Sequence, residues 1–118
     1  MSNLPAQVAF SSPAGSQWAQ AFRMQGVDIT GLAWEFVIRP TVVDRADPPL
    51  VRVTSTINAQ GQITVDTSTG AVQVVLTSAA TKALGRGPKR YALWSNPGTP
   101  SQTCWCEGVF TALSVSAA

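Results

Sequence analysis

Carboxylates and thiols are the side chains of this sequence that could do chemistry. The 118 residues include no histidine, the commonest general base and a frequent metal ligand, so Ser–His–Asp and Cys–His catalytic sets are excluded. A glycosidase would need two carboxyl groups that converge in space, but the acidic residues are scattered along the chain. They are Asp28, Glu35, Asp44, Asp47, Asp66 and Glu107. We therefore expect a protein that is not an enzyme and has no catalytic residues.

The two cysteines, Cys104 and Cys106, lie two positions apart in a segment that we expect to be a strand. Their side chains would then point to one face of the sheet, and a disulfide between them would close a small, strained ring. Two thiols without a histidine do not complete a four-ligand zinc site. The segment from Asp44 to Asp47 also lacks the glycine turn and the closing glutamate of a calcium loop. We expect small buried cysteines, no metal and no cofactor.

Arg86, Lys89 and Arg90 form the only basic cluster of the sequence, where an expected loop leads into the expected strand 90–95. Such a cluster could contact a phosphate or an acidic neighbouring subunit. It does not match a nucleotide-binding loop, which needs a lysine followed by Ser or Thr. The formal net charge of +2 is also too small to indicate general nucleic-acid binding. A protein partner is the functional interpretation that we prefer, and a solvated loop competes with it.

The chain has four tryptophans, and exposed indole rings can stack on sugars. Trp18 and Trp34 lie on apolar faces of expected strands, which predicts core positions for both. Trp94 and Trp105 lie on strands whose faces the pattern does not assign. For these two, core packing, a protein interface and a glycan site all stay open, with core or interface packing the more common.

The composition is unusually poor in charge. Hydrophobic residues make up 45% of the chain and charged residues 12%, about half the charged share of an ordinary soluble protein. Neutral polar side chains lose less than charges when they leave water, so this surface suits a protein that neighbouring subunits cover. A monomer of low charge is the competing interpretation. No apolar run is long enough to span a membrane and the N-terminus lacks a secretory signal, so we expect cytoplasmic synthesis and no membrane contact.

Apolar and polar residues alternate through most of the chain, which is typical of strands with one buried face. The pattern is clearest at residues 32–39. Further strands are expected at 7–10, 17–24, 51–57, 63–66, 72–77, 90–95 and 103–115. Ser78 is a suitable N-cap for a short helix to Leu84, and Gly85 supplies a left-handed stop. The expected core contains Trp34, Phe36, Ile38, Val72, Val74 and Leu76.

About eight short strands separated by turns predict an all-β fold, an antiparallel β-sandwich or open barrel with one short helix near residues 78–84. We expect one domain over residues 1–118, with residues 1–15 as an extended N-terminal arm, and a bulge at Gly108. The strand 51–57 carries one charge, Arg52, and neither proline nor lysine, so a neighbour could add a strand to this edge. The candidate protein-interaction residues are Val51, Arg52, Val53, Arg86, Lys89, Arg90, Trp94 and Trp105.

Several short motifs follow one another in order: Asp28, Ile29, Thr30 and Gly31 before the strand 32–39, a helical turn at Thr81 to Leu84 with Gly85, then Tyr91, Ala92 and Leu93, and finally Glu107, Gly108 and Val109. From Gln17 to Val115 this order resembles a family of small bacteriophage virion modules, β-sandwiches at the N-termini of baseplate or tail-fibre proteins. The resemblance implies a non-catalytic virion structural protein, assembled in the host cytoplasm, that serves as a tail-tip, baseplate or tail-fibre adaptor. Its partners would be other virion proteins and further copies of itself. A capsid decoration (head) protein and a carbohydrate-binding β-sandwich module are the alternatives.

Overall fold

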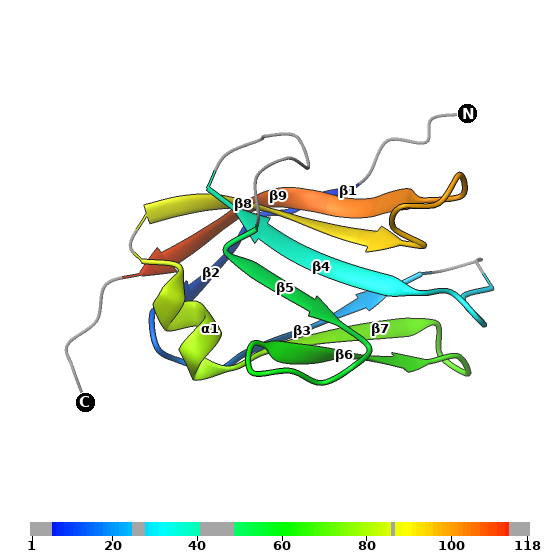
Figure 1. Cartoon of the computed structure of the whole chain (residues 1–118), viewed down its shortest axis with the longest axis horizontal. Coiled ribbons are helices and arrows are strands. Elements are labelled where there is room, and N and C mark those ends of the chain that lie inside the picture. The colour runs from blue at the N-terminus through cyan, green and yellow to red at the C-terminus, as the bar shows by residue number, and fades with distance from the viewer. Residues whose placement is uncertain (1–5, 25–27, 41–48, 86, 114–118) are drawn as a thin grey trace.

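The computed structural model describes residues 6–24, 28–40, 49–85 and 87–113. Within them, nine strands and one helix form two β-sheets that pack face to face (Figure 1). The strands are β1 (Ala6–Gln7), β2 (Phe10–Pro13), β3 (Trp18–Arg23), β4 (Trp34–Arg39), β5 (Val51–Thr54), β6 (Gly61–Asp66), β7 (Ala71–Leu76), β8 (Gly87–Ser95) and β9 (Thr103–Leu113), and the helix is α1 (Ser78–Ala83). This confirms the expected all-β sandwich with one short helix.

The larger sheet has the strand order β1-β9-β8-β4-β5, and β2 also pairs with β9. Its strands are antiparallel, except that β1 and β2 run parallel to β9. These two short strands lie one after the other along the same edge of β9, because Ala6 is opposite Cys106 and Phe10 is opposite Phe110. Residues 6–13, within the expected N-terminal arm, therefore take part in the sheet. The smaller sheet has the antiparallel order β3-β7-β6.

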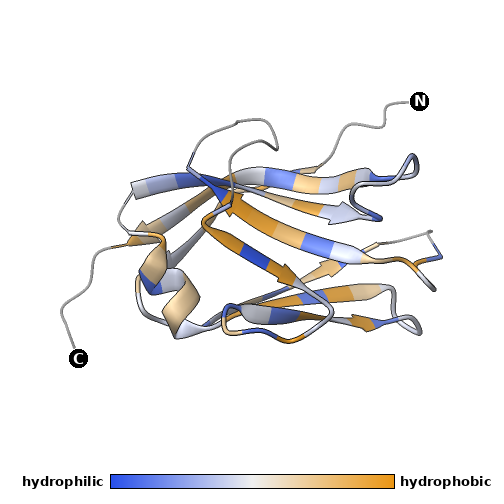
Figure 2. Cartoon of the chain, viewed as in Figure 1, coloured by the Kyte–Doolittle hydropathy of each residue, from blue (hydrophilic) through white to orange (hydrophobic). Residues whose placement is uncertain are grey.

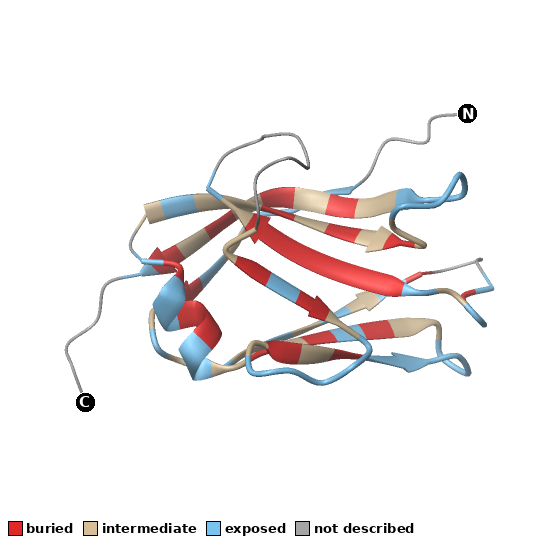
Figure 3. Ribbon diagram, in the orientation of Figure 1, coloured by how far each residue is buried: buried red, intermediate tan, exposed pale blue. Residues whose placement is uncertain are grey.

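The core lies between the two sheets, and the alternation of apolar residues decides which side chains reach it (Figure 2). In the larger sheet, Phe36 is opposite Val53 on one side and Leu93 on the other, and all three are fully buried. The six residues predicted for the core are all buried, which confirms that prediction. The strand β4 is buried along most of its length, on both of its faces (Figure 3).

Aromatic rings join the two sheets at the centre of the core. Trp18 of β3 packs edge-on against Phe110 of β9, with 5.0 Å between the ring centroids, and its ring lies 5.3 Å from that of Phe10 in β2. Phe36 of β4 stacks on Tyr91 of β8 at 5.5 Å. Such aromatic pairs contribute about 0.5–1.5 kcal/mol each beyond the burial of their area. Because the rings come from both sheets, they fix one sheet against the other.

The helix α1 closes one end of the sandwich (Figure 1). Its N-cap is Thr77 and not the expected Ser78, because the Thr77 hydroxyl accepts a hydrogen bond from the Ala80 amide. Thr81 is fully buried, and its hydroxyl donates to the Ser16 carbonyl at 2.8 Å while accepting from the Gly15 amide at 3.1 Å. These bonds tie the helix to the turn between β2 and β3.

The pairing of β8 with β9 contains a bulge that moves one cysteine to the other face of the sheet. Leu93 is opposite Cys106 but Trp94 is opposite Cys104, so Trp105 is an extra residue. The bulge thus lies at Trp105 and not at Gly108, and the two cysteines do not share a face as expected. Alternation continues on both sides of an inserted residue, so the sequence pattern alone does not locate it.

Gly108 has a different role, which is to let β9 approach the N-terminal segment closely. A Cβ atom at this position would lie 2.2 Å from the Val8 carbonyl oxygen. That oxygen accepts a hydrogen bond from the Tyr91 hydroxyl at 2.6 Å, and the Val8 amide donates to the Glu107 carbonyl at 3.1 Å. The glycine therefore allows residues 6–13 to dock on β9.

Candidate protein-interaction surface

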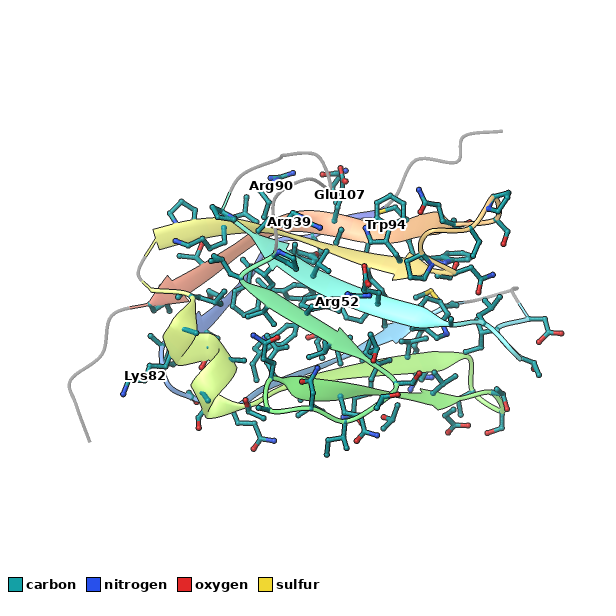
Figure 4. The ribbon with its side chains drawn as sticks, in the orientation of Figure 1. Arg39, Arg52, Lys82, Arg90, Trp94 and Glu107 are labelled. Atoms are coloured by element: carbon teal, nitrogen blue, oxygen red, sulfur yellow. The ribbon has the colours of Figure 1, made fainter. Side chains whose placement is uncertain are left out.

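The outer face of the larger sheet gathers most of the charged residues of the four strands β4, β5, β8 and β9. Side chains that alternate with the core residues form a row across these strands, in which Arg52, Val37, Ala92 and Glu107 are successive neighbours. Arg90 lies opposite Arg39 in the next row on one side, and Trp94 lies opposite Glu35 in the next row on the other. We define the outer patch as Arg39, Arg52, Arg90, Trp94 and Glu107 around Val37 and Ala92 (Figure 4).

Glu35 points away from the sandwich core, yet its side chain is only 3% exposed. Arg52 Nε donates to Glu35 Oε2 at 2.7 Å, and the Arg52 side chain is itself 60% exposed. The two residues are diagonal neighbours on β4 and β5, within reach of a long side chain. Because the Arg52 side chain is largely exposed, water screens the pair and its contribution to stability is modest, up to about 1 kcal/mol. Arg52 thus stabilises the strand pair from the outer face.

The centre of the outer patch is apolar. Val37 is only 5% exposed although it faces away from the core, and Ala92 beside it is half-buried. Trp94 is half-buried on the same face, and at the far side of the row Glu107 accepts a hydrogen bond from Gln7 Nε2 at 2.8 Å. Val37 is itself too buried to contact a partner, so the side chains that a partner would meet here are Trp94 and the arginines, both of which are enriched at protein interfaces.

The structure corrects the expectation that the strand 51–57 offers an open edge. Val51 and Val53 are 0% exposed and belong to the core, so their side chains are not available to a partner. The backbone edge is also covered, because the Arg52 amide donates to Gln60 Oε1 at 2.9 Å and its carbonyl accepts from Asn58 Nδ2 at 3.2 Å. Gln60 Nε2 donates further to the Leu50 carbonyl at 3.1 Å. The turn after β5 thus folds back on this edge.

The remaining predicted residues separate into two groups. Arg52, Arg90 and Trp94 meet on the outer patch, whereas Trp105 turns toward the core, where Nε1 donates to the Ser95 hydroxyl at 2.8 Å. Its ring packs on that of Trp34 with 6.2 Å between centroids. Arg90 lies in β8 in agreement with the expected strand 90–95, but β8 begins at Gly87, so Lys89 is also in the strand and not in the preceding loop. Arg86, Asp44 and Asp47 lie outside the described residues.

Sequence reasoning missed four residues of the outer patch, namely Val37, Arg39, Ala92 and Glu107. The signal was present for two of them: positions 35, 37 and 39 alternate with the core residues of the same strand, and so must face outward together. The sequence does not show which strands are neighbours in the sheet. Arg52, Ala92 and Glu107 lie in the same row as Val37 because β5, β4, β8 and β9 pair in this order.

Possible metal ligands and thiols are the reactive groups to consider among the described residues. No group of three or more His, Cys, Asp or Glu residues lies close enough among them to hold a metal ion. Burial raises the pKa of the Cys104 thiol to about 11 and also raises the pKa of Cys106. Both thiols are therefore protonated near neutral pH, and a protonated thiol is a poor nucleophile.

No protein-family model matches the sequence, and no curated protein matches it. Over the part of the chain that the structure describes, no helix is long and apolar enough to cross a membrane.

Proposed function

We propose that this chain is a structural protein of a bacteriophage virion, without catalytic activity, that joins neighbouring subunits as a tail-tip, baseplate or tail-fibre adaptor. The observation that supports this most strongly is the outer patch, where Trp94 and the arginines Arg39, Arg52 and Arg90 lie on one face of a paired sheet. Tryptophan and arginine are enriched at the energetic centres of protein interfaces. The resemblance of the motif order to phage virion modules supplies the setting in which such an interface would act.

The outer patch is preorganised for binding. Both β4 and β8 have hydrogen-bonded neighbours on each side, so the backbone at Val37 and Trp94 does not have to be ordered when a partner arrives. Glu35 already has Arg52 as its partner, and Glu107 already accepts a bond from Gln7. A partner that covers the patch therefore gains contact area at a small cost in side-chain ordering.

The outer face of the smaller sheet also fits a protein that is covered on more than one side. Most of its side chains are uncharged, namely Ala19, Ala21, Thr64, Gln73 and Val75, and its charged residues Arg23 and Asp66 lie together at one end, each opposite Ala71. Side chains of this kind lose little when they leave water, whereas an ordinary charged surface would have to be desolvated at a higher cost.

A protein partner accounts for the tryptophans better than a glycan does. Trp34 is buried, Trp18 and Trp105 pack against the core, and only Trp94 remains on an outer face. Its side chain is half-buried, whereas a sugar that stacks on an indole needs the ring face open. A glycan array probed with the purified chain separates the two functions, since the structural role predicts no binding to any sugar.

The proposed interface can be tested by reversing one charge on the outer patch and one charge far from it. Arg90→Glu changes the patch, and Lys82→Glu makes the same change on α1, at the end of the molecule (Figure 4). Phage particles that carry each variant are purified, and the amount of the chain in them is measured. We expect incorporation of Arg90→Glu to fall at least about tenfold, which corresponds to about 1.4 kcal/mol, with no change for Lys82→Glu. Equal incorporation of the two folded variants would show that the patch is not the interface.

A further inference from the structure

The strand β3 is an edge of the smaller sheet, and its hydrogen bonds define which residues face the open side. The Met24 amide donates to the Gly70 carbonyl at 2.8 Å, in register with the pairing of β3 with β7. Hydrogen-bonded and non-hydrogen-bonded pairs alternate in an antiparallel ladder. Trp18, Gln20 and Phe22 therefore bond to β7, and the amides and carbonyls of Ala19, Ala21 and Arg23 point to the open side.

This edge lacks the protection that two other edges of the sandwich have. Side chains of Asn58 and Gln60 bond to the backbone of β5, and the edge formed by β1 and β2 is short, interrupted and ends in Pro13. Such features prevent strand addition. Along β3, by contrast, there is no proline, lysine or bulge, and the only hydrogen bond that a described residue makes to the outward backbone groups is from Gln20 Nε2 to the Ala21 carbonyl, at 3.1 Å.

We propose that a second copy of this chain pairs with this edge, β3 against β3 in antiparallel orientation, with Ala21 opposite Ala21 of the second copy. In this register all three residues whose backbone groups point to the open side form pairs across the contact, because Ala19 of each copy lies opposite Arg23 of the other. The two smaller sheets then form one continuous sheet of six strands. The proposal rests on the proposed structural role for its biological setting and deepens it by naming a partner.

Charge and side-chain size favour a second copy in this orientation. Arg23 is the only charged residue of β3, and the antiparallel register puts the two Arg23 side chains at opposite ends of the new strand pair. A parallel pairing in register would bring them side by side, which is unfavourable for like charges. At the centre, Ala21 and Ala19 are exposed and short, so two copies can approach without steric conflict on the outer face.

The size of the contact predicts a weak dimer. Specific stable interfaces bury more than about 1,000 Å², and one pair of six-residue strands buries less than that. The isolated chain should therefore dimerise reversibly and only at high concentration. In an assembly, other contacts hold copies near one another and raise the effective concentration, so the same strand pair becomes fully occupied.

Cysteine cross-linking of the purified protein tests both the contact and its register. Directly opposed residues in a hydrogen-bonded antiparallel pair have Cα atoms about 5.5 Å apart, a distance that a disulfide can span. Under mild oxidation we expect Ala21→Cys to form a disulfide-linked dimer. Ala19→Cys is the matched control, because it has the same residue type, strand and exposure but lies roughly 14 Å along the strand from Ala19 of the second copy, at about 3.4 Å per residue. The unchanged chain measures the background from Cys104 and Cys106.

The double variant Ala19→Cys with Arg23→Cys should cross-link as well as Ala21→Cys, because those two positions face each other. Cross-linking of Ala19→Cys at least as strong as that of Ala21→Cys would overturn the register, and an absence of cross-linking at every position would overturn the dimer.

A second variant, Ala21→Pro, removes an amide that points to the open side and leaves the bonds to β7 in place. Thermal unfolding should show that this variant melts like the parent, and sedimentation should show that it no longer self-associates. Because purified protein is used, a negative result leaves the virion role to be decided by the particle experiments.

Discussion

Trp34 contains a buried polar group without a hydrogen-bond partner among the described residues, its indole Nε1. A buried donor without a partner costs about 1–3 kcal/mol. We expect Trp34→Phe to destabilise the fold by no more than about 1 kcal/mol, because the loss of ring area is offset by removal of this donor. Trp34→Ala should cost about 3–5 kcal/mol, since it leaves a cavity. Urea unfolding measures both, and equal losses for the two variants would contradict this interpretation.

The two thiols, of which Cys106 is buried and Cys104 half-buried, predict how stability changes in alkaline solution. Burial raises the pKa of Cys104 to about 11 and raises that of Cys106, whereas a thiol in the unfolded chain titrates near about 8.5. The stabilisation is complete below the unfolded value and is lost as the pH rises toward about 11, because the unfolded chain then releases protons that the folded chain keeps. Burial also raises the pKa of Tyr91, which acts in the same direction at the upper end of this range.

The urea midpoint should therefore fall between about pH 8.5 and pH 11, and it should fall less in Cys104→Ala. This variant keeps Cys106 and Tyr91, so the difference between the two curves isolates one thiol. A midpoint that does not change over this range, or an identical decrease in the variant, would show that Cys104 is not half-buried as described.

At the scale of single elements, the side chain of Gln60 protects the edge of β5. It bonds to the Arg52 amide and to the Leu50 carbonyl. We expect Gln60→Ala to lower the stability by about 1–3 kcal/mol and to increase light scattering on concentration, because two backbone groups of an edge strand become available. Gln62→Ala is the control, since that side chain donates only to the Ser55 carbonyl in an exposed loop. If both variants scatter equally, the edge is protected by something else.

The elements could be predicted from the sequence where local alternation determines them. Residues 34–39 alternate so regularly that the core position of Phe36 follows from the chain alone. The face to which Trp105 turns could not be predicted, because one inserted residue leaves the alternation on each side intact. Only the pairing of β9 with β8 reveals the inserted residue. The closed edge of β5 was missed for a related reason: it depends on side chains from the following turn, and the strand's own composition looks open.

The outer patch could be predicted only in part. Arg52, Arg90 and Trp94 were identified by residue type, but their meeting on one face depends on the order of β5, β4 and β8 in the sheet. Strand order results from long-range pairing, in which segments far apart in the sequence become neighbours. Alternation within a strand shows which face of the sheet a residue lies on, but it does not show which residues of other strands lie beside it.

For the whole molecule, the low charge predicts assembly that resists salt. The sequence has eight basic and six acidic residues, and Arg52 of the outer patch forms its ion pair with Glu35 of the same chain. Few ion pairs are thus available to be screened between subunits. Raising the salt concentration from about 0.15 M to about 0.5 M, which shortens the screening length below about 8 Å, should leave the chain bound in purified particles. Release of the chain by this treatment would indicate an interface dominated by charge.

The protein composition of purified phage particles tests the structural role most directly. Two kinds of particle are compared, one produced from the genome that encodes this chain and one from the same genome after deletion of its gene. The account predicts that the chain is present in a small, symmetric number of copies relative to the major capsid protein, and that deletion gives particles with defective tails and lost infectivity. A copy number close to that of the major capsid protein would instead identify capsid decoration. Normal tails, intact heads and undiminished infectivity without the gene would contradict the structural role.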